Sequence, residues 1–167
     1  FPFSLQSNII GILFRSFIII SFCEELVKWL FTYVICWKDK NFNYVYDAIV
    51  YCVFISLGFA SIENLIAILS NSGGFTLALQ RGLITVPAHA FFGIISGYYL
   101  GLAKKYEARR WNKRKRKYII LSLLIPIIVH GMFDSLLFLS STAYRLFATA
   151  LLVYLSLSSA LNVVKTS

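Results

Sequence analysis

Ionisable side chains lie inside the most apolar stretches of this sequence, where they could carry acid–base or metal chemistry. They are five of the seven acidic residues and both histidines: Glu24, Glu25, Asp47, Glu63, Asp134, His89 and His130. Placing such groups in hydrocarbon costs free energy unless they face one another or water, so their default interpretation is functional. Carboxylates and imidazoles are the groups that transfer protons and bind divalent metal ions in hydrolytic enzymes.

Helical spacing arranges several of these residues in pairs. Lys28 follows Glu24 by four residues and Glu25 by three, so either carboxylate can pair with the ammonium while the other stays free. His130 and Asp134 are also four residues apart, which places an imidazole and a carboxylate on one helix face. Taken singly, each pair could instead be a structural contact between helices.

The overall composition predicts the elements that hold these residues. The chain of 167 residues is 59% hydrophobic and 14% charged, with a mean hydropathy of +0.75, so lipid must solvate much of its surface. Since one crossing takes about 20 residues, we predict an all-α, polytopic membrane helix bundle of about five transmembrane helices, forming one domain over residues 1–167. The expected spans are about Asn8–Cys36, Tyr44–Leu69, Thr76–Lys104, Tyr118–Phe138 and Ala143–Val164.

Local signals refine these spans. An alternative to the first span is a break near Ser21. The polar and glycine residues from Ser70 to Gly74 predict a turn between the second and third spans. Gly93, Gly97 and Gly101 recur at every fourth position of the third span, a pattern that lets two membrane helices pack closely.

Basic residues concentrate between the third and fourth spans. The formal net charge of +9 comes largely from the segment Lys104–Lys117, which we interpret as a cytoplasmic loop under the positive-inside rule. Alternation then places the N-terminus outside and the C-terminus in the cytoplasm. A basic connector between spans is the ordinary signature of membrane orientation, so we expect the lipid bilayer, and no nucleic acid, as a partner.

Most of the ionisable residues fall at a similar depth. At about 1.5 Å per helical residue, Glu24, Glu25 and His130 lie roughly 18 Å from the cytoplasmic side. Asp47 is only about one turn from the inner end of its span, and we expect a structural or interfacial role for it. The other six residues come from four helices and could converge in one layer of the membrane.

The order of these residues resembles a known family. The matching segments are Glu24-Glu25-Leu26-Val27-Lys28, Asp47, Gly58-Phe59-Ala60-Ser61-Ile62-Glu63-Asn64, Pro87-Ala88-His89-Ala90 and His130-Gly131-Met132-Phe133-Asp134. Together they resemble the PrsW family of intramembrane proteases, over the first four expected helices. That family is related to the CAAX prenyl endopeptidases, whose FxxxH and HxxxN motifs correspond here to Phe59 with Glu63 and to His130 with Asp134.

The resemblance implies an intramembrane endopeptidase that hydrolyses peptide bonds of membrane-anchored proteins. Glu24 or Glu25 would activate the attacking water, and both are therefore predicted to be catalytic. Lys28 and Asn64 lie within the matching segments and are expected to support the site. The resemblance also suggests membrane-anchored anti-sigma factors as substrates and a bacterial plasma membrane as the location.

A divalent metal ion, expected to be zinc, is the predicted cofactor. Glu63, His89 and His130 supply two imidazoles and one carboxylate, the ligand set of many zinc hydrolases. Asp134 is predicted as a fourth ligand or as the hydrogen-bonding partner of a ligand. A mechanism without metal stays open, in which a glutamate activates water unaided and the histidines stabilise the oxyanion.

A proton-coupled secondary transporter or channel is the alternative function. Such proteins also gather acids and histidines in the middle of the membrane. Against this alternative, the sequence shows no two-fold repeat, and the ionisable residues fall in one layer rather than along a path.

Overall fold

The computed structural model describes residues 8–70 and 74–139, together with positions 150, 154 and 158. Within these residues the regular secondary structure is helical and contains no strand, so the all-α prediction is confirmed. The expected fifth span, about Ala143–Val164, lies outside the described residues apart from the three isolated positions.

The first span is one continuous helical rod whose hydrogen-bonding pattern changes along its length. Its segments are α1 (Ile9–Phe14), the π-helix η2 (Arg15–Ser21), α2 (Phe22–Phe31) and the π-helix η3 (Thr32–Cys36). Asn8 caps the N-terminus, where its Oδ1 accepts a hydrogen bond from the amide of Gly11 at 2.6 Å. Ser21 keeps right-handed helical angles, φ −63° and ψ −41°, so the alternative of a break at this residue is wrong. The wide π turns instead lie on both sides of the segment that carries Glu24, Glu25 and Lys28.

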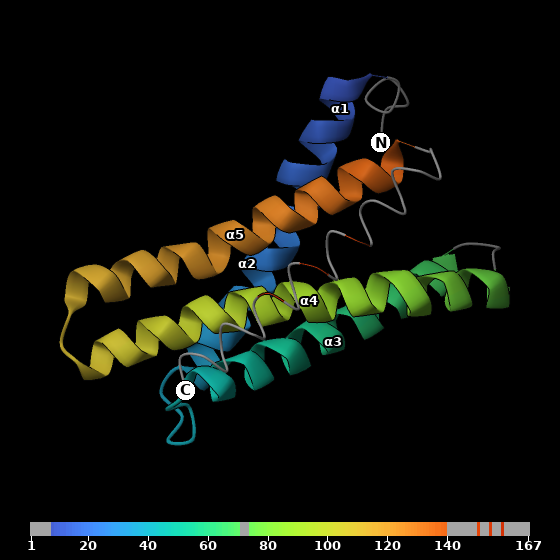
Figure 1. Cartoon of the computed structure of the whole chain (residues 1–167). Coiled ribbons are helices and arrows are strands. Elements are labelled where there is room, and N and C mark those ends of the chain that lie inside the picture. The colour runs from blue at the N-terminus through green and yellow to red at the C-terminus, as the bar shows by residue number, and fades with distance from the viewer. Residues whose placement is uncertain (1–7, 71–73, 140–149, 151–153, 155–157, 159–167) are drawn as a thin grey trace.

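Three further helices are long and apolar enough to cross a membrane. These are α3 (Val45–Ser70), α4 (Gly74–Ala108) and α5 (Asn112–Phe138), and their bounds contain the predicted second, third and fourth spans almost entirely. Successive helices run antiparallel (Figure 1). Helix α4 lies between α3 and α5 and packs against both. The chain is therefore an integral membrane protein, and its described part is a helical bundle.

The expected basic loop from Lys104 to Lys117 is much shorter than predicted. Helix α4 continues to Ala108 and α5 begins at Asn112, so only residues 109–111 form the turn, with Arg110 at φ 58°. Lysine and arginine are strong helix formers, and this accounts for the correction. Glu107 of α4 also joins the two helix ends through an ion pair with Lys115 of α5, and it pairs with Lys104 of its own helix at 3.2 Å.

Glycines bring α3 and α4 into backbone contact, as the spacing predicted. A Cβ atom added at Gly97 would lie 2.5 Å from Cα of Ile49, and one at Gly101 would lie 2.6 Å from Cα of Val45. Only the missing side chains permit this approach. The close packing fixes α3 against α4 and so sets the distance between the acidic residue of α3 and the histidine of α4.

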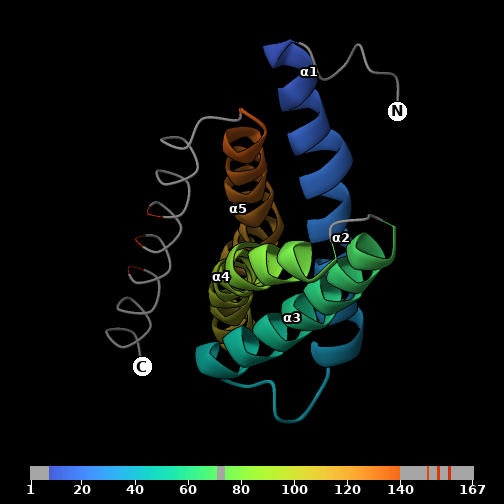
Figure 2. The ribbon, with the colours of Figure 1, turned by 90° about the vertical axis from the view of Figure 1, so that its right-hand side faces the viewer.

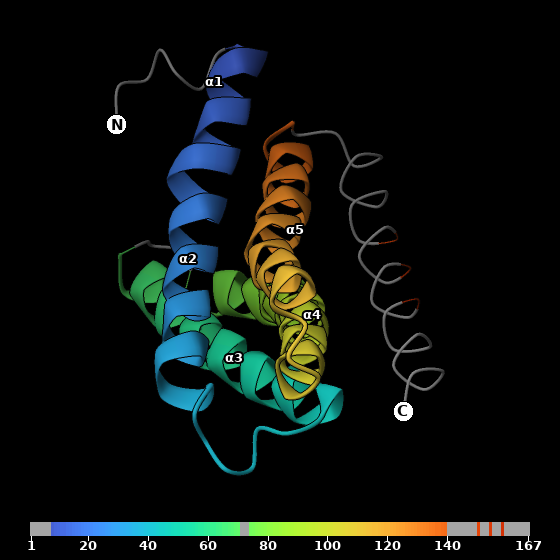
Figure 3. The ribbon, with the colours of Figure 1, turned by 90° about the vertical axis from the view of Figure 1, so that its left-hand side faces the viewer.

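The first rod crosses α3 and α4 at a steep angle and lies alongside α5 (Figures 2 and 3). Its contact with α5 is also close, because a Cβ atom added at Gly131 would lie 2.5 Å from the ring of Phe17. The crossing brings α2 over the middle of the other three helices. The predicted convergence of four helices in one layer therefore occurs at this point.

Candidate active site

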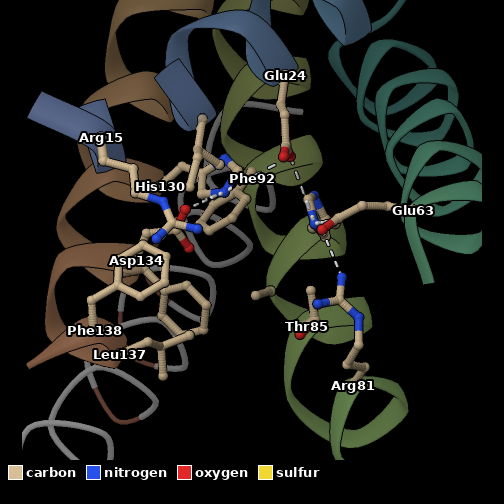
Figure 4. Close-up of a pocket in the computed structure, with 14 residues that line it drawn as sticks. Arg15, Glu24, Glu63, Arg81, Thr85, Phe92, His130, Asp134, Leu137 and Phe138 are labelled. Carbon is tan, nitrogen blue, oxygen red and sulfur yellow. Dashed lines mark hydrogen bonds and ion pairs between the residues drawn. The ribbon is translucent and has the colours of Figure 1, made fainter. Parts of the chain in front are cut away.

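A cavity of about 270 Å³ lies where the first rod crosses the other helices. It receives side chains from the first rod, α3, α4 and α5 (Figure 4). Its polar lining consists of Arg15, Glu24, Glu63, Arg81, Thr85, His89, His130 and Asp134. Five of the six residues predicted for the catalytic and metal sites are among them. The sixth, Glu25, does not line the cavity but is hydrogen-bonded to His130, which does.

The open choice of a partner for Lys28 is decided in favour of Glu25. Nζ of Lys28 donates to Oε1 of Glu25 at 2.5 Å, and the two side chains are only 4% and 3% exposed. The same Oε1 accepts a hydrogen bond from Nδ1 of His130 on α5 at 2.8 Å. Lys28 also lies 2.9 Å from Nδ1 of His89 on α4. Glu25 and Lys28 thus tie α2 to both histidines.

The surroundings of Glu24 differ from those of Glu25. Its carboxylate reaches into the cavity, and among the described residues its buried Oε2 has no hydrogen-bond partner. That oxygen lies 4.0 Å from Nε2 of His89 and 4.0 Å from Nε2 of His130 (Figure 4). A buried polar atom without a partner is costly, so this position indicates that the site takes up a further group.

Glu63 lies across the cavity from His130 and is held by two neighbours on α4. Its Oε2 accepts a hydrogen bond from Nε2 of His89 at 3.0 Å, and its Oε1 accepts one from Arg81 at 2.6 Å. Arg81 also donates through Nε to Oδ1 of Asn64 at 2.7 Å. Asn64 therefore contacts the cavity lining through Arg81.

His130 and Asp134 form the expected pair on α5, with Nε2 and Oδ2 3.5 Å apart. The ring of Phe92 stacks on His130 with 4.4 Å between centroids, which holds the imidazole plane in place. Asp47, in contrast, lies away from the cavity. Its Oδ2 accepts hydrogen bonds from the amides of Asn43 and Tyr44, so it caps the start of α3 and is structural, as expected.

The partners of the two histidines indicate which ring nitrogens carry protons. A carboxylate only accepts, so Nδ1 of His130 carries a proton toward Glu25, while its Nε2 faces the carboxylates of Asp134 and Glu24 at 3.5 and 4.0 Å and donates when the ring is protonated. An ammonium only donates, so Nδ1 of His89 accepts from Lys28, and its Nε2 donates to Glu63. The cavity therefore gathers the carboxylates of Glu24, Glu63 and Asp134 around two imidazoles.

This donor set fits a divalent cation. Oxygen atoms of Glu24 and Glu63 and a nitrogen atom of His89 all lie within 4.8 Å of one another. Their contacts of 3.0 and 4.0 Å are near the separation of about 3.3–3.5 Å between ligand atoms in a tetrahedral zinc site. Binding at His89 requires that its Nε2 proton leaves, as is usual when a metal displaces a proton.

The geometric group differs from the predicted ligand set. Glu63 and His89 belong to both, but the group includes Glu24, whereas His130 and Asp134 lie on the far side of the Glu24 carboxylate (Figure 4). Helical phase within one segment cannot show this arrangement, because it depends on how four helices pack.

Two cationic residues of the cavity, Arg15 and Arg81, were missed by the sequence interpretation. Neither belongs to the segments that resemble the family. A signal was present, because a lone arginine in an apolar span is as costly to bury as an acid. The rule that an ionisable side chain in an apolar span is functional by default selects both Arg15 and Arg81 when it is applied to cations as well.

Comparison with known proteins gives one consistent result. A family model described as PrsW family intramembrane metalloprotease matches residues 3–161. Three relatives carry the name Protease PrsW. The chain is 42% identical to that of Halalkalibacterium halodurans over 77% of the chain, 36% to that of Clostridioides difficile over 92%, and 37% to that of Bacillus subtilis over 76%.

The matched regions make up 57%, 63% and 56% of these three relatives, so the chain corresponds to somewhat more than half of their length. No solved structure matches the chain. The family match covers nearly the whole chain and includes every helix that lines the cavity. The chain therefore belongs to the PrsW family of intramembrane metalloproteases.

Proposed function

We propose that this chain hydrolyses peptide bonds of membrane-anchored proteins and that Glu24 is the general base. The observation that carries the proposal is the buried Oε2 of Glu24, which faces two imidazoles and has no partner among the described residues. A carboxylate held in a cavity of this size is suited to take a proton from water. Membership of a protease family supports the same reaction.

In the proposed reaction, water binds in the cavity beside Glu24 and attacks the carbonyl carbon of the substrate peptide. Oε2 of Glu24 accepts a proton from that water as the new C–O bond forms. Glu24 then passes the proton to the amide nitrogen, the C–N bond breaks, and an acid and an amine are released. No other reactant is required.

Glu25 has a different role from its neighbour in this proposal. Its carboxylate is bound by Lys28 and His130 and does not line the cavity, so it is a positioning residue. It orients His130 so that Nε2 faces the reacting groups. When His130 is protonated, that nitrogen can donate to the developing oxyanion.

Glu63 and His89 are the residues that would hold a divalent metal, with Glu24 beside them as the general base, and zinc suits their mixed oxygen and nitrogen ligands. Such an ion would supply Lewis-acid polarisation of the substrate carbonyl and of bound water.

Metal analysis of purified protein should find about one ion per chain, and less in the Glu63→Gln variant. Glu107→Gln, an acid at the far end of α4, is the matched control. Full activity in protein shown to be metal-free would instead support the mechanism without metal.

The substrate class and the orientation are part of the proposal. Membrane-anchored anti-sigma factors are candidates to include in a substrate panel. We place the 109–111 turn in the cytoplasm, the N-terminus outside and the protein in a bacterial plasma membrane, which agrees with the basic helix ends at that turn and with the bacterial relatives.

Profiling of new N-termini tests the function even while the substrate is unidentified. Membranes from cells that express the wild type should contain cleaved single-span proteins that are absent with Glu24→Gln. Cells with Glu107→Gln should give the wild-type cleavage pattern. If the wild type and Glu24→Gln produce the same N-termini, the proposal is wrong.

A further inference from the structure

Arg15 is the one cation of the cavity that lacks an acidic partner among the described residues. It lies in η2, is half-buried, and lines the cavity with Glu24, His130 and Asp134. Its guanidinium carbon is 4.7 Å from the centroid of the Phe138 ring, and among residues 8–70 and 74–139 no hydrogen bond or ion pair accompanies this cation–π contact. Arg81, across the cavity, is bound by acidic and amide oxygens instead (Figure 4).

The chain itself supplies no other acid for Arg15. All seven acidic residues lie in the described part of the chain. Asp39, Asp47 and Glu107 are at the other end of the bundle, near the turns that follow η3 and α4. Asp134 lines the same cavity, but its carboxylate pairs with His130 at 3.5 Å. Glu25 and Glu63 have cationic partners of their own. The seventh acid, Glu24, lines the cavity too, but its Oε2 faces His89 and His130 at 4.0 Å, and no ion pair joins it to Arg15 in the described part of the chain.

We propose that Arg15 forms a carboxylate-binding subsite for the substrate, which rests on the proposed peptidase function. A guanidinium binds a carboxylate through two parallel hydrogen bonds, and this pairing is strong where water is scarce. The ring of Phe138 contacts one face of the guanidinium, and no described residue accepts a hydrogen bond from its N–H edge. The carboxylate would come from an acidic side chain or from a free C-terminus.

The position of Arg15 sets how far this carboxylate lies from the bond that is cut. Arg15 precedes Glu24 by nine residues of one continuous rod, which at the rise of an α-helix corresponds to about 13 Å along its axis and to less in the wider π turns. An extended peptide covers that distance in about four residues. The subsite therefore selects substrates with a carboxylate within about four residues of the scissile bond.

Cleavage of a mapped single-span substrate tests the selection. Each position near the bond is replaced by Asp and, in parallel, by Asn, and shortened versions end in a carboxylate or an amide. The wild type should cleave one Asp form about tenfold to hundredfold faster than its Asn form, or the acid faster than the amide, which also tells the two sources apart. Arg15→Gln should remove this preference, and Arg15→Glu should favour Lys over Gln at the same position.

A matched control and a binding measurement complete the design. Arg116→Gln changes an exposed arginine of α5 and should keep the wild-type preference. In the binding measurement, short apolar peptides of leucine and alanine with one Asp should protect Arg15 from phenylglyoxal, as measured by mass spectrometry. Peptides with Asn in place of Asp should not. This measurement needs no cleavage.

The outcomes separate the subsite from the reaction. If Asp peptides protect Arg15 from phenylglyoxal but no substrate is cleaved, the proposed function is wrong and the carboxylate-binding subsite is supported. Cleavage without preference in the wild type, or a preference that survives in Arg15→Gln, would overturn the subsite. An Arg15→Gln defect that is equal for Asp and Asn substrates and follows the phospholipid headgroups of the vesicle would assign Arg15 to lipid phosphate and would also overturn it.

Discussion

The same substitution at the two adjacent glutamates, Glu24 and Glu25, should lower the free energy of unfolding by very different amounts. Glu25→Gln removes the only carboxylate bound to the buried ammonium of Lys28, at 2.5 Å, and also the acceptor of His130, at 2.8 Å. Breaking one side of a buried ion pair leaves an uncompensated charge and typically costs about 3–5 kcal/mol. Glu24→Gln removes no such contact, because Oε2 of Glu24 has no hydrogen-bond partner in the described part of the chain, and its cost should stay within about 1 kcal/mol.

The measurement is the free energy of unfolding in mixed micelles for the wild type and both variants. A third variant supplies the control, since Lys28→Met combined with Glu25→Gln removes both charges and should recover part of the lost stability. If Glu25→Gln is as stable as the wild type, Glu25 does not balance the charge of Lys28. If Glu24→Gln loses as much stability as Glu25→Gln, the difference drawn between the two glutamates is wrong.

Three further predictions concern packing, positioning and orientation. Gly97→Ala should cost about 1–3 kcal/mol in the same unfolding measurement, because the new methyl group meets the backbone of Ile49 at 2.5 Å, whereas Gly82→Ala, with open space around it, should be neutral or stabilising. Arg81→Gln should slow substrate cleavage about tenfold or more through the loss of its contacts with Glu63, and Arg81→Lys should recover part of the rate. A cysteine placed at Asn112 should react only with a membrane-permeant reagent in intact cells, and labelling by an impermeant reagent would reverse the proposed orientation.

Much of the fold follows from the sequence because length and apolar composition determine which segments can cross a membrane. The three helices α3, α4 and α5 and most of their bounds were predicted in this way, and the glycine spacing predicted the close packing of α3 on α4. The basic connector was predicted too long, because charge alone does not end a helix of lysines and arginines.

The site was predicted less completely, because its details depend on contacts between helices. Spacing along α2 left both glutamates as partners for Lys28, and only the position of His130 on α5 separates them. The grouping of Glu24 with Glu63 and His89 likewise arises from three different helices. Arg81 could have been selected from its place in an apolar span, but its contact with Glu63 could not.

The most direct test of the account is the rate of the bond-breaking step in purified protein that is reconstituted into lipid bilayers. Wild type, Glu24→Gln and the control Glu107→Gln would be compared under single-turnover conditions on a substrate mapped in membranes. If Glu24 is the general base, Glu24→Gln should be slower by about 10²–10⁴-fold with unchanged unfolding free energy, and Glu107→Gln should match the wild type. A folded Glu24→Gln protein that cleaves at the wild-type rate would contradict the central claim.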